Sequence, residues 1–157
     1  MANNCYIDLR IKTETTKQAA GLRKELRAAF EQAAREDVGA FFGSECYLFA
    51  GHVKQKGTEL FIGGWVKWGY GDDEFVEMFN WLRTKATIKK LNMHYEEWLN
   101  ELYGEYDFDG ETLRNIFLEE KDFPAQTAND CEDFEGYCAK VEAAFQKNRV
   151  TRFIPIA

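Results

Sequence analysis

Acidic and aromatic side chains alternate at short intervals between Leu91 and Asp122, and they are the residues of this chain best suited to chemistry or recognition. Residues 96–135 hold 14 aspartates and glutamates against only Arg114 and Lys121, a net charge of −12 in a chain whose total is −7. Negative charge is therefore concentrated in one segment. Spaced carboxylates can bind hard cations or attract the basic surface of another protein.

A metal site is the first of these possibilities. Asp107, Asp109 and Glu111 alternate along the segment DFDGE, with His94 and Glu97 nearby in the sequence. However, DFDGE straddles a predicted turn and lacks the twelve-residue loop with a terminal bidentate glutamate that such a calcium site needs. We expect a solvated hairpin whose charges prevent pairing at its edge, with no metal and no cofactor.

Nucleophilic catalysis is the second possibility. A cysteine or serine nucleophile needs a base beside it, and the only histidines, His52 and His94, fall in predicted strands without G-x-S-x-G or a comparable signature. The four cysteines form no C-x-x-C pair, so we expect buried free thiols. The sequence predicts no enzyme, although a histidine and a cysteine meeting across a sheet stays an open alternative.

The elements that would position these side chains follow from hydrophobic periodicity. Alternating and helical patterns predict strands at residues 4–12, 46–53, 60–68 and 88–95, and helices at residues 16–35 and from Asp72 or Asp73 to Ala86. A capping box of Thr15 and Gln18 precedes the first helix. This strand–helix–strand–strand–helix–strand order is the split βαβ arrangement of ferredoxin-like folds, an antiparallel sheet with both helices on one face.

The second part of the chain extends that unit. Tyr103–Phe108 and Thr112–Leu118 flank the hairpin signal Asp109-Gly110. Asn129 or Asp130 would cap a third helix with the apolar stripe Cys131, Phe134, Cys138, Val141 and Phe145, and Arg149–Ile156 could form an edge strand.

The predicted fold class is therefore α+β: a ferredoxin-like βαββαβ antiparallel sheet with an added acidic β-hairpin and a C-terminal helix. We expect one domain over residues 1–157, long enough for its own core. Its parts would be the ferredoxin-like unit at 1–95, the acidic hairpin extension at 96–122, and the C-terminal helix and edge strand at 128–157.

An aromatic sheet face offers a different function. Tyr6, Phe61 and Trp65 would point away from the first two helices, beside the basic residues Arg10, Lys12 and Lys67. RNA-recognition modules stack bases on such faces, and a single-stranded nucleic-acid-binding module is our alternative hypothesis. The segment GTELFIGGWVKW does not match the RNA-recognition signature. Because the third helix needs a surface for its apolar stripe, we expect it to cover this face.

The acidic tract itself predicts a contact face for another protein. Its interleaved tyrosines and tryptophan are binding-type side chains, and its carboxylates would present a duplex-like array of charge to a basic nucleic-acid channel. Like charges repel, so we expect no direct binding of nucleic acid. The predicted partner-binding residues are Glu96, Glu97, Trp98, Glu101, Tyr103, Glu105, Tyr106, Asp107, Asp109 and Glu111.

Three stretches, MANNCYIDLRI, GGWVKWGYG and LNMHYEEWLNELYGEYDFDGE, resemble the Api-like proteins, small proteins with a ferredoxin-like domain encoded by phages and integrative elements. In that family a strand ending in a tyrosine–glutamate pair leads into a glycine-containing hairpin, matched here by Tyr95, Glu96, Gly104 and Gly110. The family's glycine and cysteine after this pair are replaced by Trp98-Leu99-Asn100. The resemblance spans residues 1–118 and implies cargo of a mobile element that acts inside a bacterium.

Small acidic proteins of such origin often inhibit host defence nucleases, as anti-CRISPR and anti-restriction proteins do. Our leading hypothesis is a non-enzymatic inhibitor of a host nucleic-acid-handling defence complex, whose acidic, aromatic-rich surface competes with nucleic acid. The partner would be a host protein with a basic nucleic-acid-binding surface. We expect a cytoplasmic monomer or homodimer without membrane contact, because no run of about 18 apolar residues and no signal-peptide pattern occurs.

Overall fold

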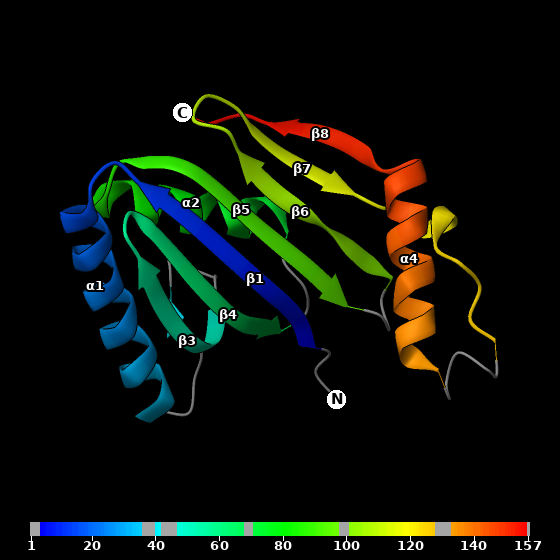
Figure 1. Cartoon of the computed structure of the whole chain (residues 1–157), viewed down its shortest axis with the longest axis horizontal. Helices are drawn as coiled ribbons and strands as arrows, with labels where there is room; N and C mark the ends of the chain where they lie inside the picture. The colour runs from blue at the N-terminus through cyan, green and yellow to red at the C-terminus, as the bar shows by residue number, and fades with distance from the viewer. Residues whose placement is uncertain are drawn as a thin grey trace.

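The computed structural model of this chain describes residues 4–35, 40–41, 47–67, 71–97, 101–127 and 133–156 (Figure 1). Its helices are α1 (Thr16–Arg35), α2 (Asp72–Lys85) and α4 (Phe134–Asn148), with a short 3-10 turn, η1 (Glu120–Asp122). Its strands are β1 (Asn4–Thr13), β2 (Ala40–Phe41), β3 (Tyr47–Lys56), β4 (Glu59–Lys67), β5 (Ile88–Glu97), β6 (Leu102–Phe108), β7 (Leu113–Phe117) and β8 (Val150–Ile154).

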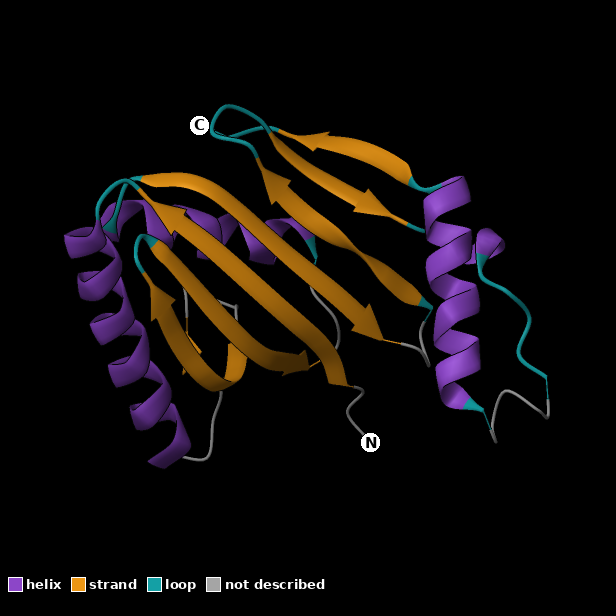
Figure 2. Ribbon diagram, viewed as in Figure 1, coloured by secondary structure: helices purple, strands orange, loops and turns teal. Residues whose placement is uncertain are grey.

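The strands in the described residues form one antiparallel sheet of eight, in the order β2-β3-β4-β1-β5-β6-β7-β8 (Figure 2). The predicted α+β class is confirmed. The sheet is larger than the four-stranded unit that we expected, because β6 pairs directly with β5 and β8 pairs with β7. The added hairpin and the C-terminal strand thus continue the sheet.

Helices α1 and α2 cover one face of this sheet, and α2 lies behind the sheet in Figure 1. The main core forms there, between Leu22 of α1, Phe75 of α2 and the inward residues of the strands, such as Leu9 and Met93, all fully buried. Strand alternation explains the arrangement, since successive side chains point to opposite faces. The other face therefore receives the polar residues of β1 and its neighbours.

The predicted capping box at the start of α1 is confirmed in its first half, because the Thr15 hydroxyl accepts a hydrogen bond from the Gln18 backbone N–H at 3.1 Å. Its second half does not form, because the Gln18 side chain accepts from the Thr87 backbone N–H at 3.0 Å instead. The predicted capping of α2 by Asp72 or Asp73 is wrong. Gly71 is the N-cap residue and makes no side-chain cap. Asp72 is therefore the first residue inside the helix, and its carboxylate contacts distant strands instead of capping the helix.

Asp72 binds three side chains from β6, β7 and β8. Its Oδ1 accepts hydrogen bonds from the Tyr106 hydroxyl at 3.0 Å and from Asn115 Nδ2 at 3.1 Å. Its Oδ2 lies 2.7 Å from Nη2 of Arg152. The Asn115 side chain in turn accepts a hydrogen bond from the Tyr95 hydroxyl at 2.8 Å. This Asp72 network ties the start of α2 to the added strands.

Helix α4 lies on the opposite face from α1 and α2, but not where we expected it. Its buried residues Tyr137, Val141 and Phe145 pack against Tyr103 of β6 and Leu118, which follows β7. The prediction that the third helix covers the aromatic face of β1 and β4 is wrong. The reason is its connection: β8 pairs with β7 and begins two residues after α4 ends, so the helix is held at that edge.

The N-terminal boundary of α4 also differs from the prediction. Asp133 caps the helix by accepting a hydrogen bond from the Gly136 N–H at 3.0 Å. The predicted caps Asn129 and Asp130, with Cys131, fall outside the described residues. Phe134, predicted to be buried, is 53% exposed. It is the first residue of α4, and the buried side of the helix begins three residues later, at Tyr137. None of the helices in the described ranges combines the length and apolar character needed to cross a bilayer.

Candidate functional site: the acidic hairpin and the open sheet face

The hairpin of β6 and β7 separates the acidic tract into an inward and an outward set. Alternation along β6 turns Tyr106 into the core, where its ring stacks on Phe75 with centroids 4.1 Å apart and 1% of the residue remains exposed. Tyr106 therefore lies inside the molecule, away from any contact face. Glu105 and Asp107, on either side of it, point to the opposite face and are half-buried.

Two further predicted contact residues are also buried. Tyr103 lies beneath α4, with its ring centroid 5.2 Å from that of Phe145. Glu97 is buried at the end of β5. Together with Tyr106, these residues contradict the expectation that the whole tract is exposed. Strand alternation turns Tyr106 and Glu97 inward, whereas Tyr103 lies on the open face and is covered by α4. Trp98 falls outside the described residues.

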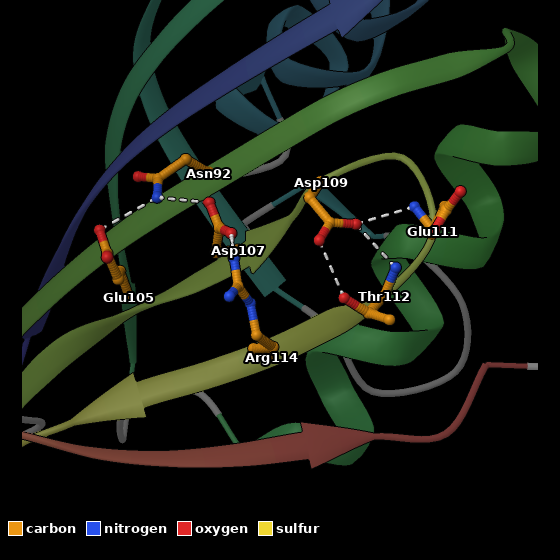
Figure 3. Close-up of polar contacts among 7 residues, drawn as sticks. All are labelled: Asn92, Glu105, Asp107, Asp109, Glu111, Thr112 and Arg114. Carbon is orange, nitrogen blue, oxygen red and sulfur yellow. Dashed lines mark hydrogen bonds and ion pairs between the residues drawn. The ribbon is translucent and has the colours of Figure 1, made fainter.

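The outward carboxylates of β6 are held by neighbouring side chains, as Figure 3 shows. Nδ2 of Asn92 on β5 donates to Glu105 at 3.0 Å and to Asp107 at 3.3 Å. Arg114 on β7 forms an ion pair with Asp107. One of the two carboxylates is therefore neutralised within the hairpin, and both are fixed in place on the open face.

Asp109 shapes the hairpin turn. Its Oδ1 accepts hydrogen bonds from the backbone N–H groups of Glu111 at 2.9 Å and Thr112 at 2.8 Å, and its Oδ2 accepts one from the Thr112 hydroxyl at 3.0 Å. The predicted hairpin is confirmed, but its centre falls one residue later than Asp109-Gly110. Gly110 has a φ of +106°, which a side chain rarely tolerates.

We expect the hairpin turn to loosen in acid between about pH 4 and pH 2. The hydrogen bonds from Thr112 and Glu111 lower the pKa of Asp109 from 3.8 to about 2. A lowered pKa in the folded state means that the stabilisation is complete above the unfolded pKa and disappears as pH falls through the folded one. The amide chemical shifts of Glu111 and Thr112, followed by NMR, should move with a midpoint near pH 2. In Asp109→Ala both shifts should be independent of pH over this range, and a midpoint near pH 4 in the unaltered chain would contradict the assignment.

The remaining acids of the predicted contact set are dispersed. Glu96 of β5 lies 3.1 Å from Nε2 of His94 and is half-buried. Glu101 is half-buried in the connection before β6, with a φ of +52°. Glu111 is exposed at the hairpin tip. Of the nine predicted residues that the structure describes, three are buried, so these nine do not form one continuous electronegative surface. Glu96, Glu105 and Asp107 nevertheless share the open face.

The open face of β4 and β1 presents aromatic and cationic side chains. Tyr6 pairs across the strands with Trp65, and Arg10 pairs with Phe61. Tyr6 is 55% exposed, Phe61 and Trp65 are half-buried, and the Arg10 guanidinium lies 5.8 Å from the centroid of the Phe61 ring. The side chain of Lys67, the third predicted cation beside them, is outside the described set.

Cations surround Phe61 on this face. Lys54 of β3 lies directly opposite Phe61 on the neighbouring strand. On the other side of β4, Lys12 of β1 lies opposite Lys90 of β5. The exposed charged residues of the four strands β3, β4, β1 and β5 in this region are Lys54, Lys56, Arg10, Lys12 and Lys90, against Glu59 and Asp8. The sequence suggested only part of this cluster, because β3 and β5 contribute to it through strand order and register.

A hollow of about 370 Å³ lies between the basic strands and the acidic strand. Its central strands, β1 and β5, contribute the cations Arg10, Lys12 and Lys90, together with Asn92. The carboxylates Asp107 and Asp109 line it on the side of β6, and Phe61 and Glu59 line it on the side of β4. The hollow thus offers positive charge in the middle, hydrogen-bond acceptors on the β6 side, and an aromatic ring with one carboxylate on the β4 side.

The two thiols in the described residues, Cys5 and Cys138, are poorly suited to nucleophilic attack, which requires a thiolate. Burial, followed by the charge of Glu97, raises the pKa of Cys5 to about 12. Burial also raises the pKa of the half-buried Cys138. Cys5 is a buried free thiol, as predicted, whereas the free thiol of Cys138 is only half-buried. Cys46 and Cys131 lie outside the described residues.

Within the described ranges, no group of three or more histidine, cysteine, aspartate or glutamate side chains is arranged to hold a metal ion. Comparison with known proteins adds no assignment to these surfaces: no family model, no curated protein and no solved structure matches this chain.

Proposed function

We propose that this chain is a non-enzymatic binding module that takes single-stranded nucleic acid on the open face of β3, β4, β1 and β5. The observation that supports this proposal most is the position of α4, which leaves Tyr6 more than half exposed instead of covering it. The order β3-β4-β1-β5, with α1 and α2 on one face, supports describing residues 4–97 as a ferredoxin-like unit. In such a unit the second sheet face is available for ligands.

The chemistry of this face fits a single strand of nucleic acid. Proteins that bind single strands combine aromatic side chains, on which bases stack, with cations that contact the backbone. Phe61 and Tyr6 supply rings, and Arg10 supplies a guanidinium plane beside Phe61. The open face of these strands carries five exposed cations, Arg10, Lys12, Lys54, Lys56 and Lys90, although the whole chain has a net charge of −7. Binding should therefore be weak at high salt and measurable at low salt.

We expect Tyr6→Ala combined with Phe61→Ala to weaken binding of a single-stranded DNA 12-mer at least tenfold. Stacking is worth about 1–3 kcal/mol per base, and the two substitutions remove two stacking surfaces. Fluorescence anisotropy with a labelled, mixed-sequence oligonucleotide in 50 mM salt measures the dissociation constant.

The matched control for this experiment is Phe153→Ala. Phe153 is 67% exposed on β8, so its loss removes a similar aromatic ring from the same sheet, three strands beyond β5. Its affinity should stay within twofold of the unaltered chain. If the unaltered chain gives no anisotropy change up to 100 µM protein, or if Phe153→Ala weakens binding as much as the double substitution, the proposal fails.

A second candidate function is the inhibitor that the acidic tract suggests, acting in the cytoplasm of a bacterial host. It is favoured by one observation: Asn92 holds Glu105 and Asp107 side by side on the exposed face. Such a pair could occupy a basic nucleic-acid channel of a host defence protein. Replacing Glu105 and Glu111 by lysine tests it without removing the ion pair of Asp107 or the turn bonds of Asp109.

The two candidates give opposite results in simple assays. Under the inhibitor hypothesis a pull-down from bacterial lysate retains a basic protein that salt elutes, and the lysine variant loses that protein. The same hypothesis predicts no gel shift with single-stranded DNA. Under the nucleic-acid hypothesis the gel shift occurs, and the lysine variant binds DNA at least as well because the face has lost negative charge.

A further inference from the structure

The hollow between β1, β5 and β6 has charges of opposite sign on its two sides. Lys12 and Lys90 face each other across β1 and β5, and among the described residues neither forms an ion pair with a carboxylate. Like charges directly opposite each other on neighbouring strands destabilise a sheet unless something compensates them. Glu59 of β4 lies opposite Lys12 on its other side and offsets part of that repulsion. An anion held between the two ammonium groups would offset the rest, so this part of the hollow suits a phosphate.

The opposite side of the hollow offers hydrogen-bond acceptors. Asp107 accepts one hydrogen bond from Asn92 and pairs with Arg114, whereas an ionised carboxylate has about four lone-pair sites. Its remaining capacity faces the hollow that it lines. The Arg114 ion pair also holds this carboxylate in place. A ligand group that reaches this side must therefore be a hydrogen-bond donor.

The separation of the two ends matches one nucleotide. Asp107 lies one strand from β5 and is paired with Asn92, which is two residues from Lys90. With strands about 4.8 Å apart and about 3.4 Å per residue, the Lys90 and Asp107 backbones are about 8 Å apart. A nucleotide spans such a distance from its phosphate to the far edge of its base. The base would lie over Asn92, which pairs with Arg10 on one side and with Asp107 on the other. Phe61 lines the hollow from β4, one strand beyond Arg10.

We propose, building on the nucleic-acid function proposed above, that this hollow is a nucleotide subsite that selects cytosine over thymine and uracil. The phosphate contacts Lys12 and Lys90, and the exocyclic N4 amino group of cytosine donates a hydrogen bond to Asp107. Aspartate and glutamate accept from cytosine N4 in protein–DNA interfaces. Thymine and uracil place the O4 carbonyl at that position, and two acceptors facing each other repel.

The test compares oligonucleotides of identical length and charge. Homopolymeric dC and dT 12-mers, each measured by fluorescence anisotropy in 50 mM salt, should differ about tenfold in dissociation constant in favour of dC, within the range known for one good base contact. Asp107→Ala should reduce the ratio to below twofold. The control Glu111→Ala removes the same charge from the hairpin tip, outside the hollow, and should leave the ratio unchanged.

A change in the ligand makes the test independent of protein stability. N4,N4-dimethylcytosine lacks both amino hydrogens, so a 12-mer built from it should bind the unaltered chain no better than dT. Equal affinity for dC and dT, or a dC preference that survives both Asp107→Ala and N4 dimethylation, overturns the cytosine subsite but leaves nucleic-acid binding intact. No binding by any oligonucleotide overturns the proposed function and the subsite together.

Discussion

Asp72→Ala is expected to lower the free energy of unfolding by about 3 kcal/mol, since a buried polar group left without its partner costs about 1–3 kcal/mol. The substitution removes the acceptor shared by the Tyr106 hydroxyl and Asn115 Nδ2, both on buried residues. It also leaves the Arg152 guanidinium without its carboxylate. Because these partners come from β6, β7 and β8, the loss should weaken the attachment of the added strands to α2.

Urea denaturation followed by circular dichroism measures this loss, with Asp73→Ala as the control. Asp73 is exposed in the same first turn of α2, so its replacement removes only the favourable interaction with the helix dipole, at most about 1 kcal/mol. Asp72→Asn should fall between the two, because an amide oxygen still accepts one hydrogen bond but lacks the charge that pairs with Arg152. Equal stability of the Asp72→Ala and Asp73→Ala variants would show that the network contributes nothing.

Local patterns were sufficient to predict most of the elements of this fold. The alternation of Cys5, Ile7, Leu9 and Ile11 defines the buried side of β1, and the same rule places Tyr6 and Arg10 outside. The hairpin of β6 and β7 follows from its turn residues. Such features depend on neighbours in the sequence, which is why they can be predicted without the structure.

The position of α4 could not be predicted in the same way. An apolar stripe shows that a helix needs a surface, but several surfaces satisfy it. The choice is decided by the pairing of β8 with β7, which depends on residues more than 30 positions apart. Asp72 is a similar case: two consecutive aspartates at a helix start are typical of capping, whereas the true partner Arg152 is 80 positions away.

The contact face is harder to predict from the sequence, because a tract rich in acids is not one surface. Period-two alternation over residues 103–108 turns Tyr106 inward and leaves Glu105 and Asp107 outside. The pairing of these acids with Asn92 and Arg114 required the register of β5, β6 and β7. Composition locates negative charge along the chain, but strand pairing determines how much of it faces solvent.

Gly104→Ala is expected to destabilise the fold by about 3 kcal/mol, the upper range for overpacking a well-packed core. A Cβ atom at this position of β6 would lie 2.5 Å from the carbonyl oxygen of Ile116, 2.6 Å from the Tyr95 hydroxyl and 2.9 Å from Cα of Phe117. Two of these three atoms belong to the backbone and cannot move without shifting β7. The third, the Tyr95 hydroxyl, would lose its hydrogen bond to Asn115.

Gly21→Ala in α1 provides the matched control for that substitution. A Cβ atom at Gly21 meets nothing within 4 Å, and the residue is exposed in a helix, so alanine should stabilise the chain by about 0.5–1 kcal/mol. The two variants make the same chemical change and should shift the urea midpoint in opposite directions. Gly104→Ala should also reduce the preference for dC over dT, because moving β6 away from β5 displaces Asp107 from the hollow. A Gly104→Ala variant with unchanged stability and unchanged base preference would show that β5, β6 and β7 do not pack as closely as the structure has them.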